Sequence, residues 1–222
     1  MKLALVTTPW NSASRAGAIA RELVRHLADT EQIEVFVERG REGGDYFGWK
    51  ARSASALVPR EHDHVLHFVA DEPECAFVLP LVRELGGCAV LLDWELAAAA
   101  RAAYPELAAS GLRGVIRALR EGGFDEARRY AKSRGGDRPA SISLNRSIVR
   151  FADSFFAPSE SLRELILDSR NAPTPVGVLD FASANWPDLA HAVREQLERF
   201  PPPRTARKGL LLRRVREELR RG

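Results

Sequence analysis

Apolar residues at the start of the chain occur first in a short continuous run and then at helical spacing. Residues 2–8 form a β-rich apolar run that ends before Pro9, and the apolar positions from Ala16 to Leu27 fall on one face of a helix. A second apolar run at 33–38 completes the order strand, helix, strand. This order predicts a βαβ unit with a right-handed crossover.

The alternation of strand and helix patterns continues to residue 181. Further strands are predicted at residues 63–69, 88–92, 154–159 and 174–181, and helices at residues 75–85, 143–153, 160–167 and 185–200. Residues 39–60 are glycine-rich and charged, which predicts a loop with at most short pieces of strand. The strands are continuously apolar, as in parallel sheets covered on both faces. The predicted fold class is therefore α/β, a Rossmann-like doubly wound, mostly parallel sheet with helices on both faces.

One large domain, residues 1–203, is expected to contain all of these elements. Within it, residues 94–138 have a mostly helical pattern broken by Pro105 and several glycines. Helical insertions of this kind at a strand end often form the wall or lid of a ligand cleft. Residues 185–200 are predicted to form a closing helix, the last amphipathic helix of the domain before the tail.

The C-terminal tail, residues 204–222, is basic and amphipathic. It carries eight basic residues against two acidic ones, a local charge of +6, whereas the whole chain has a net charge of +3. Apolar positions such as Leu211, Val215 and Leu219 would share one side of a helix, which suits an anionic membrane surface or a partner's groove. A solvated helix docked on the domain is the alternative. Nucleic acid is not an expected partner, because the tail has no aromatic residues among its basic ones.

Length and composition allow a substantial core. The 222 residues are 45% apolar, and no apolar run approaches the roughly 20 residues that cross a bilayer. The N-terminus lacks the features of a signal peptide, so a cytoplasmic location is expected, with peripheral contact at the inner face of the membrane as an extension through the tail. Cys75 and Cys88 form no CxxC pair and have apolar neighbours, which favours core positions over a disulfide or metal ligation.

Common nucleotide-binding and catalytic motifs are absent from the sequence. The loop after the first strand, TTPWNSASRAG, contains Gly17 alone in place of GxGxxG, and neither GxxxxGKS/T nor GxSxG occurs. No NAD, FAD or other cofactor is therefore expected. The N-terminus of the following helix could still hold an anion, with Gly17 permitting close backbone approach. Alternatively, Ser12 or Ser14 only caps that helix.

Three histidines lie around the third predicted strand. In an extended strand His62 and His64 share one face, whereas His67 points to the other. Three ligands to one metal ion are then not presented together, so no metal site is expected.

Acidic and aromatic residues follow the third and fourth predicted strands. Asp71 and Glu72 come after the third, at the end of a strand where open α/β sheets bind ligands. They could equally cap the next helix, since acids are favourable in a helix's first turn. Asp93, Trp94 and Glu95 follow the fourth strand and present the same two alternatives, a ligand cleft or a helix cap.

Several segments of the chain resemble the N-terminal domain of family 4 glycosyltransferases of the GT-B fold. They are KLALVTTPWNSASRAGAIARELVRHLADTEQIEVFVE, HVLHFVADEPECAFVLPLVRELGGCAVLLDWEL and LNRSIVRFADSFFAPSESLRELIL. The resemblance spans roughly residues 1–181. It implies one half of an enzyme that transfers a sugar, retaining its configuration, from a nucleotide donor, with this half contributing mainly the acceptor site.

Two departures from the family pattern bear on activity. Family members often carry a histidine immediately before the acid that matches Asp93, and here that position is Leu92. The family's C-terminal domain, which holds the nucleotide sugar, would need about 150 further residues that this sequence does not contain.

Two functions therefore remain as hypotheses, and no catalytic residue is assigned. The first is a sugar- or glycolipid-acceptor-binding half that works with a separate donor-domain subunit. The second is a non-catalytic binding or scaffold protein that keeps the fold. The expected substrate-binding residues are Trp10, Ser14, Gly17, Asp71, Glu72, Asp93, Trp94 and Glu95.

Overall fold

The computed structural model describes residues 1–10, 13–44, 46–108, 111–132, 143–170, 173–182 and 185–203. The predicted tail, residues 204–222, lies outside them, as do residues 133–138 of the predicted insertion and Ser12. A seven-stranded sheet, parallel at every pairing, has the order β3-β2-β1-β4-β5-β6-β7. The strands are β1 (Lys2–Val6), β2 (Gln32–Val37), β3 (Ala51–Ser53), β4 (His64–Val69), β5 (Cys88–Leu91), β6 (Ser154–Ala157) and β7 (Val176–Val178).

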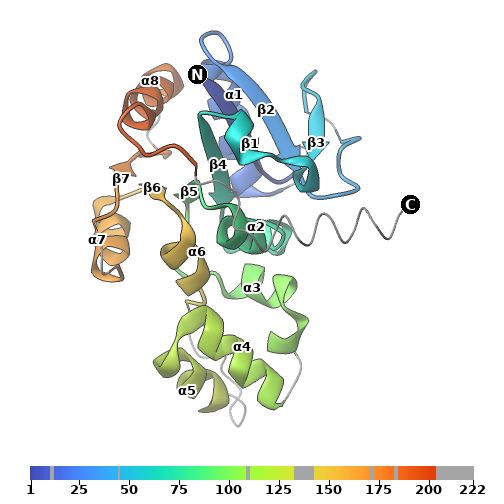
Figure 1. Ribbon diagram of the computed structural model, residues 1–222, viewed down its shortest axis with the longest axis vertical. Coiled ribbons are helices and arrows are strands. Elements are labelled where there is room, and N and C mark those ends of the chain that lie inside the picture. The colour runs from blue at the N-terminus through green and yellow to red at the C-terminus, as the bar shows by residue number, and fades with distance from the viewer. Residues whose placement is uncertain are drawn as a thin grey trace.

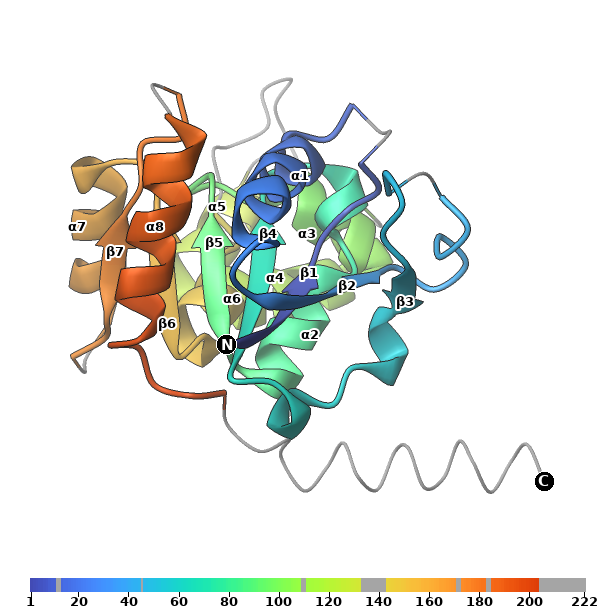
Figure 2. The same ribbon diagram turned by 90° about the horizontal axis from the view of Figure 1, so that it is seen from above.

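Helices cover both faces of this sheet. They are α1 (Arg15–Leu27), α2 (Val78–Leu85), α3 (Ala97–Ala103), α4 (Leu112–Gly122), α5 (Phe124–Lys132), α6 (Arg146–Phe151), α7 (Glu160–Asp168) and α8 (Trp186–Leu197). One face carries α1 with α8 beside it, and the other carries α2 with α6 beside it (Figures 1 and 2). The predicted Rossmann-like α/β fold is confirmed.

The strand order reverses direction between β1 and β4. From β1 the chain passes through α1 to β2 on one side, and from β4 it passes through α2 to β5 on the other. Right-handed crossovers in opposite directions place α1 and α2 on opposite faces of the sheet. A crevice forms outside the carboxyl ends of the strands at such a reversal, which is where α/β sheets of this type bind ligands.

The glycine-rich segment at 39–60 contributes one short edge strand. β3 pairs with β2, so that Ala51 faces Val35 and Ser53 faces Val37. Short 3₁₀ turns follow at Ala54–Ala56 and Pro59–Glu61. The predicted loop with short pieces of strand is thus confirmed, and the strand piece lies at the edge, where three residues can pair on one side only.

The helices between β5 and α6 form a layer outside α2 and α6. α4 packs against both α5 and α6, and it lies away from the sheet (Figure 1). The buried side chain of Glu121 fastens this layer, because its carboxylate accepts a hydrogen bond from the Ser147 hydroxyl on α6. Arg117, one turn earlier on α4, lies 3.4 Å from the same carboxylate. Burying a carboxylate is tolerated only with partners of this kind.

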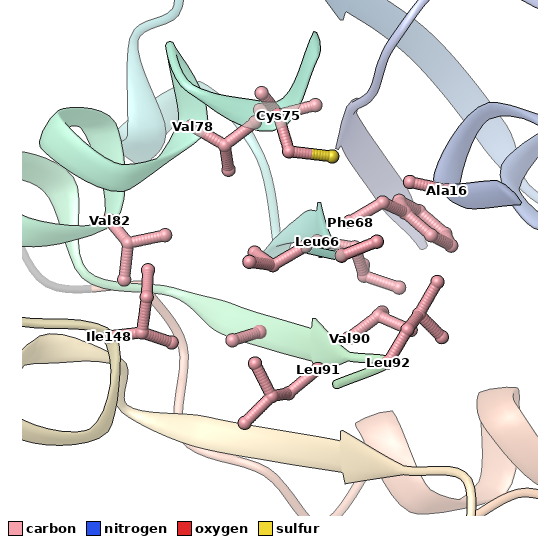
Figure 3. Close-up of a cluster of buried hydrophobic side chains, with 14 of the residues drawn as sticks. Ala16, Leu66, Phe68, Cys75, Val78, Val82, Val90, Leu91, Leu92 and Ile148 are labelled. Carbon is pink, nitrogen blue, oxygen red and sulfur yellow. The ribbon is translucent and has the colours of Figure 1, made fainter. Parts of the chain in front are cut away.

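The core lies between the sheet and the helices on each face. Cys75 and Cys88 are both free and buried in it, which confirms their predicted core positions (Figure 3 labels Cys75). Burial raises the pKa of each thiol to about 12, so neither is a thiolate nucleophile near neutral pH. None of the helices in the described part of the chain is both long and apolar enough to span a bilayer.

Candidate functional site at the carboxyl ends of β1, β4 and β5

The N-terminus of α1 is occupied by a carboxylate of the chain itself. Glu72, which follows β4, accepts hydrogen bonds from the Ser14 hydroxyl at 2.5 Å and from the Arg15 backbone N–H at 2.8 Å. Ser14 is the N-cap of α1, and its hydroxyl also accepts from the Gly17 N–H at 3.2 Å. The anion expected at this helix end is therefore supplied by Glu72.

Gly17 permits a close approach, but the approaching atoms belong to the loop that follows β1. A Cβ at this position would lie 2.7 Å from the Thr8 hydroxyl oxygen and 2.8 Å from the Pro9 carbonyl oxygen. Thr8 also donates a hydrogen bond to Ser14 at 2.7 Å. Because Gly17 has no side chain, α1 packs directly against the backbone of this loop.

Asp71 caps a helix that lies elsewhere in the sequence. Its Oδ1 accepts hydrogen bonds from the backbone N–H groups of Ala98 at 2.5 Å and Ala99 at 3.2 Å, in the first turn of α3. The N-cap residue of that helix, Leu96, offers no side-chain acceptor. Asp71 therefore satisfies N–H groups that would otherwise lack a partner at the helix end.

Asp93 joins the ends of β4 and β5 to α1. Its Oδ2 accepts from the Asp71 backbone N–H at 2.9 Å and forms an ion pair with the guanidinium of Arg15. The Asp93 side chain is 30% exposed and that of Arg15 is 53% exposed. Asp93 and Glu72 thus lie beside the first turn of α1, whereas Asp71 joins them through its backbone N–H and directs its carboxylate to α3.

The two aromatic residues predicted for the site lie apart from this network. Trp10 is 3% exposed, with Tyr46 edge-on to its ring at 5.7 Å and Phe47 stacked at 6.5 Å between ring centres. The half-buried Trp94 packs against the core, and its backbone carbonyl accepts a 2.7 Å hydrogen bond from Asn145. Glu95 is exposed. Asp93 therefore joins the network, whereas Trp94 packs on the core.

Arg15 belongs to the network, and the sequence prediction missed it. It is the first residue of α1, directly after Ser14, and its backbone and side chain each contact a different carboxylate. Three acids predicted at one site require a cation nearby. Charge balance could therefore have pointed to Arg15, which directly follows the predicted residue Ser14.

The position that would hold a histidine in the resembling family is buried here. Leu92 is 7% exposed and lies in the apolar cluster that also contains Ala16 and Phe68 (Figure 3). Its backbone N–H donates to the Val69 carbonyl at 2.8 Å and so extends the pairing of β5 with β4. The side chain contributes packing at this point and offers no group for proton transfer or hydrogen bonding.

The histidines are placed separately. His62 lies before β4 with its Nδ1 3.2 Å from the Val58 carbonyl, while His64 and His67 belong to β4. Among the described residues, no group of three histidine, cysteine, aspartate or glutamate side chains could hold a metal ion.

Fold and site together define an α/β protein with a Rossmann-like parallel sheet and a polar network at its strand reversal. No protein-family model matches the chain, and no curated protein matches it.

The capping role of Asp71 gives a direct test of the network. Asp71→Ala should lower the free energy of unfolding by about 1 kcal/mol, because two N–H groups at the start of α3 lose their acceptor. Urea denaturation measures this change. Asp168→Ala, at the exposed end of α7, is the matched control and should stay within about 0.5 kcal/mol of the wild type. An Asp71→Ala value no larger than the control would contradict the capping role.

Proposed function

We propose that the chain is a glycosyltransferase-like protein that binds the sugar or glycolipid acceptor and acts with a separate subunit that binds the nucleotide sugar. The observation that carries this proposal is the pair formed by Arg15 and Asp93 at the strand reversal. Both side chains are partly exposed, and Asp93 Oδ1 has no hydrogen-bond partner in the described parts of the chain. A carboxylate oxygen held in place beside a guanidinium suits hydrogen bonding to sugar hydroxyls.

Glu72 supports the assignment of the donor to another subunit. In Rossmann-like sheets the phosphates of a nucleotide bind at the N-terminus of the helix after the first strand, because free N–H groups and the helix dipole attract them. The Glu72 carboxylate takes that place here. A nucleotide diphosphate would have to displace a carboxylate that is already hydrogen-bonded.

Within this proposal the chain positions the acceptor, and the partner subunit stabilises the leaving group. Asp93 orients an acceptor hydroxyl by accepting its hydrogen bond, and Arg15 holds the carboxylate in place. Transfer then requires the second subunit, because both proximity and stabilisation of the departing diphosphate depend on groups from both sides of the cleft.

Two binding measurements test the proposal. Titration of uridine diphosphate glucose into the chain alone should release no binding heat. A glycan array should give signals that Asp93→Ala lowers by about tenfold or more, since a hydrogen bond to a charged group contributes about 1.5–3 kcal/mol. Asp168→Ala is again the control and should leave the signals unchanged. Micromolar binding of the nucleotide sugar to the chain alone, or array signals indifferent to Asp93, would contradict the proposal.

A non-catalytic binding or scaffold protein is the second candidate. It is favoured by the use of Asp71 and Glu72 as helix caps and by the buried Leu92 in place of a histidine. Sugar transfer that occurs only when the chain is mixed with a donor-binding subunit would exclude this candidate. Glycan binding without transfer in the same mixture would support it.

A further inference from the structure

A second polar site lies in the outer helical layer, away from the strand ends. It is a pocket of about 530 Å³ between α2, α4 and α6. None of the residues that line it takes part in the hydrogen-bond network at the carboxyl ends of β1, β4 and β5. Four of its lining side chains are arginines: Arg83, Arg120, Arg146 and Arg150.

The positive charge of this pocket is largely unbalanced. No carboxylate lines it, and no carboxylate of the described residues pairs with Arg120, Arg146 or Arg150. Arg83 has one acid nearby, Glu121 at 3.9 Å, and that carboxylate is buried and also bonded by Arg117 and Ser147. Four guanidinium groups around one cavity repel one another, and a bound polyanion with several oxygen acceptors relieves this repulsion.

The pocket wall continues into an exposed apolar stripe. Leu112, Ile116 and Leu119 follow one another at spacings of four and three along α4, and are 74%, 41% and 42% exposed. Phe124, at the start of α5, is 74% exposed. Leu119 itself lines the pocket. These four account for most of the large apolar side chains exposed on the described residues, so the exposure is concentrated here.

We propose that this surface binds an anionic phospholipid at a bilayer. The phosphate of the headgroup enters the arginine pocket, and the apolar side chains of α4 and Phe124 lie among the upper parts of the acyl chains. A helix with an apolar stripe flanked by basic residues takes this position at a membrane interface. A water-soluble phosphate compound would fill the pocket and leave the adjoining stripe exposed to water, which is why a lipid fits the combined surface better.

This inference does not depend on the proposed function, since the two sites share no residue. The tail, residues 204–222, lies outside the described residues, and the proposed lipid contact is assigned to α2, α4, α5 and α6 instead. The test therefore uses the full chain, so that any contribution of the tail is present in every variant.

Co-sedimentation with vesicles provides the test. The wild type should bind vesicles of phosphatidylcholine with 30% phosphatidylglycerol, at about 0.1 M salt, and should not bind pure phosphatidylcholine. Arg120→Gln with Arg146→Gln should weaken binding about 25-fold, since each basic side chain near an anionic surface contributes about fivefold. Leu112→Ser with Phe124→Ser should weaken it at least tenfold. All four side chains are exposed, so unfolding curves should match the wild type.

Matched controls separate this surface from total charge and general hydrophobicity. Arg39→Gln with Arg60→Gln removes the same charge from exposed positions elsewhere, and Leu165→Ser with Leu167→Ser removes exposed leucines from α7. Each control should change binding less than twofold. Equal vesicle binding by the wild type and both test variants, or no binding to anionic vesicles, would overturn the proposal. Micromolar binding of glycerol 3-phosphate that persists in Leu112→Ser with Phe124→Ser, without vesicle binding, would assign the pocket to a soluble phosphate compound instead.

Discussion

Between pH 6.5 and pH 4, the wild type should lose about 3 kcal/mol more folding free energy than His67→Leu does. His67 lies in β4, is fully buried, and neither of its ring nitrogens has a hydrogen-bond partner among the described residues. Burial disfavours the charged imidazolium and lowers the pKa of His67 to about 4. In the unfolded chain the pKa of a histidine is about 6.5.

The direction of this effect follows from proton binding. Above pH 6.5 the imidazole is neutral in both states, and the folded state carries no penalty. As the pH falls from 6.5 towards 4, the unfolded chain takes up a proton that the folded chain refuses, so stability is lost. A pKa difference of about 2.5 units corresponds to about 3 kcal/mol.

Urea unfolding at several pH values from 7.5 to 4 measures the effect. His67→Leu keeps a side chain of similar size and removes the titrating group, so the difference between its curve and that of the wild type isolates His67 from the carboxylates common to both. His191→Leu, at an exposed position of α8, is the control for the exchange of a histidine for a leucine. Parallel curves for the wild type and His67→Leu would show that the interior accommodates the charged ring.

The fold could be predicted from the sequence because the strands are buried on both faces. All six positions of β4, for example, are buried, so its apolar residues do not alternate with exposed polar ones. Short pieces of strand were predicted within residues 39–60, but β3 could not be located among them, because three residues at the edge of a sheet carry no periodic signal. β3 is held in the sheet by its pairing with β2, and that pairing cannot be read from the three residues of β3 themselves.

The location of the site residues could be predicted from the sequence, whereas their hydrogen-bond partners could not. Asp71, Glu72 and Asp93 follow apolar strands, and parallel strands bring their carboxyl ends to one edge. Which N–H groups these acids contact depends on how α1 and α3 begin beside them. Glu72 caps a helix that starts 57 residues earlier, so the local alternative of capping the next helix pointed to the wrong partner. Sequence-local capping rules do not contain such long-range pairs.

The residues after β5 show how one short segment divides between these roles. Asp93 contacts Arg15 and leaves one carboxylate oxygen available, whereas Trp94 packs on the core and Glu95 faces solvent. Leu92 belongs to the sheet and its apolar cluster. The chain thus changes from core to candidate site within a single residue, which is typical of the carboxyl end of a buried parallel strand.

Gly87→Ala should be the most destabilising of the glycine substitutions considered, at about 2–4 kcal/mol. Gly87 precedes β5 and has a φ of +92°, in the region that L side chains rarely adopt. A Cβ there would also lie 2.9 Å from the Val65 carbonyl oxygen and 3.2 Å from Nε2 of His67. The strained backbone costs about 1 kcal/mol or more, and overpacking against β4 adds about 1–3 kcal/mol.

Two further glycines separate these contributions. Gly48 has a φ of +86°, and no atom lies within 4 Å of the place a Cβ would take, so Gly48→Ala should cost about 1 kcal/mol through the backbone alone. Gly43 has open space and no positive φ, and Gly43→Ala should lie within about 0.5 kcal/mol of the wild type. Urea unfolding at pH 7.5 should therefore rank the variants in the order Gly87, Gly48, Gly43. If Gly87→Ala costs no more than Gly48→Ala, the backbone before β5 moves to make room for the added Cβ, and the close packing on His67 is not maintained. In that case the pH dependence expected of His67 should also shrink in Gly87→Ala, because the loosened ring would gain access to water.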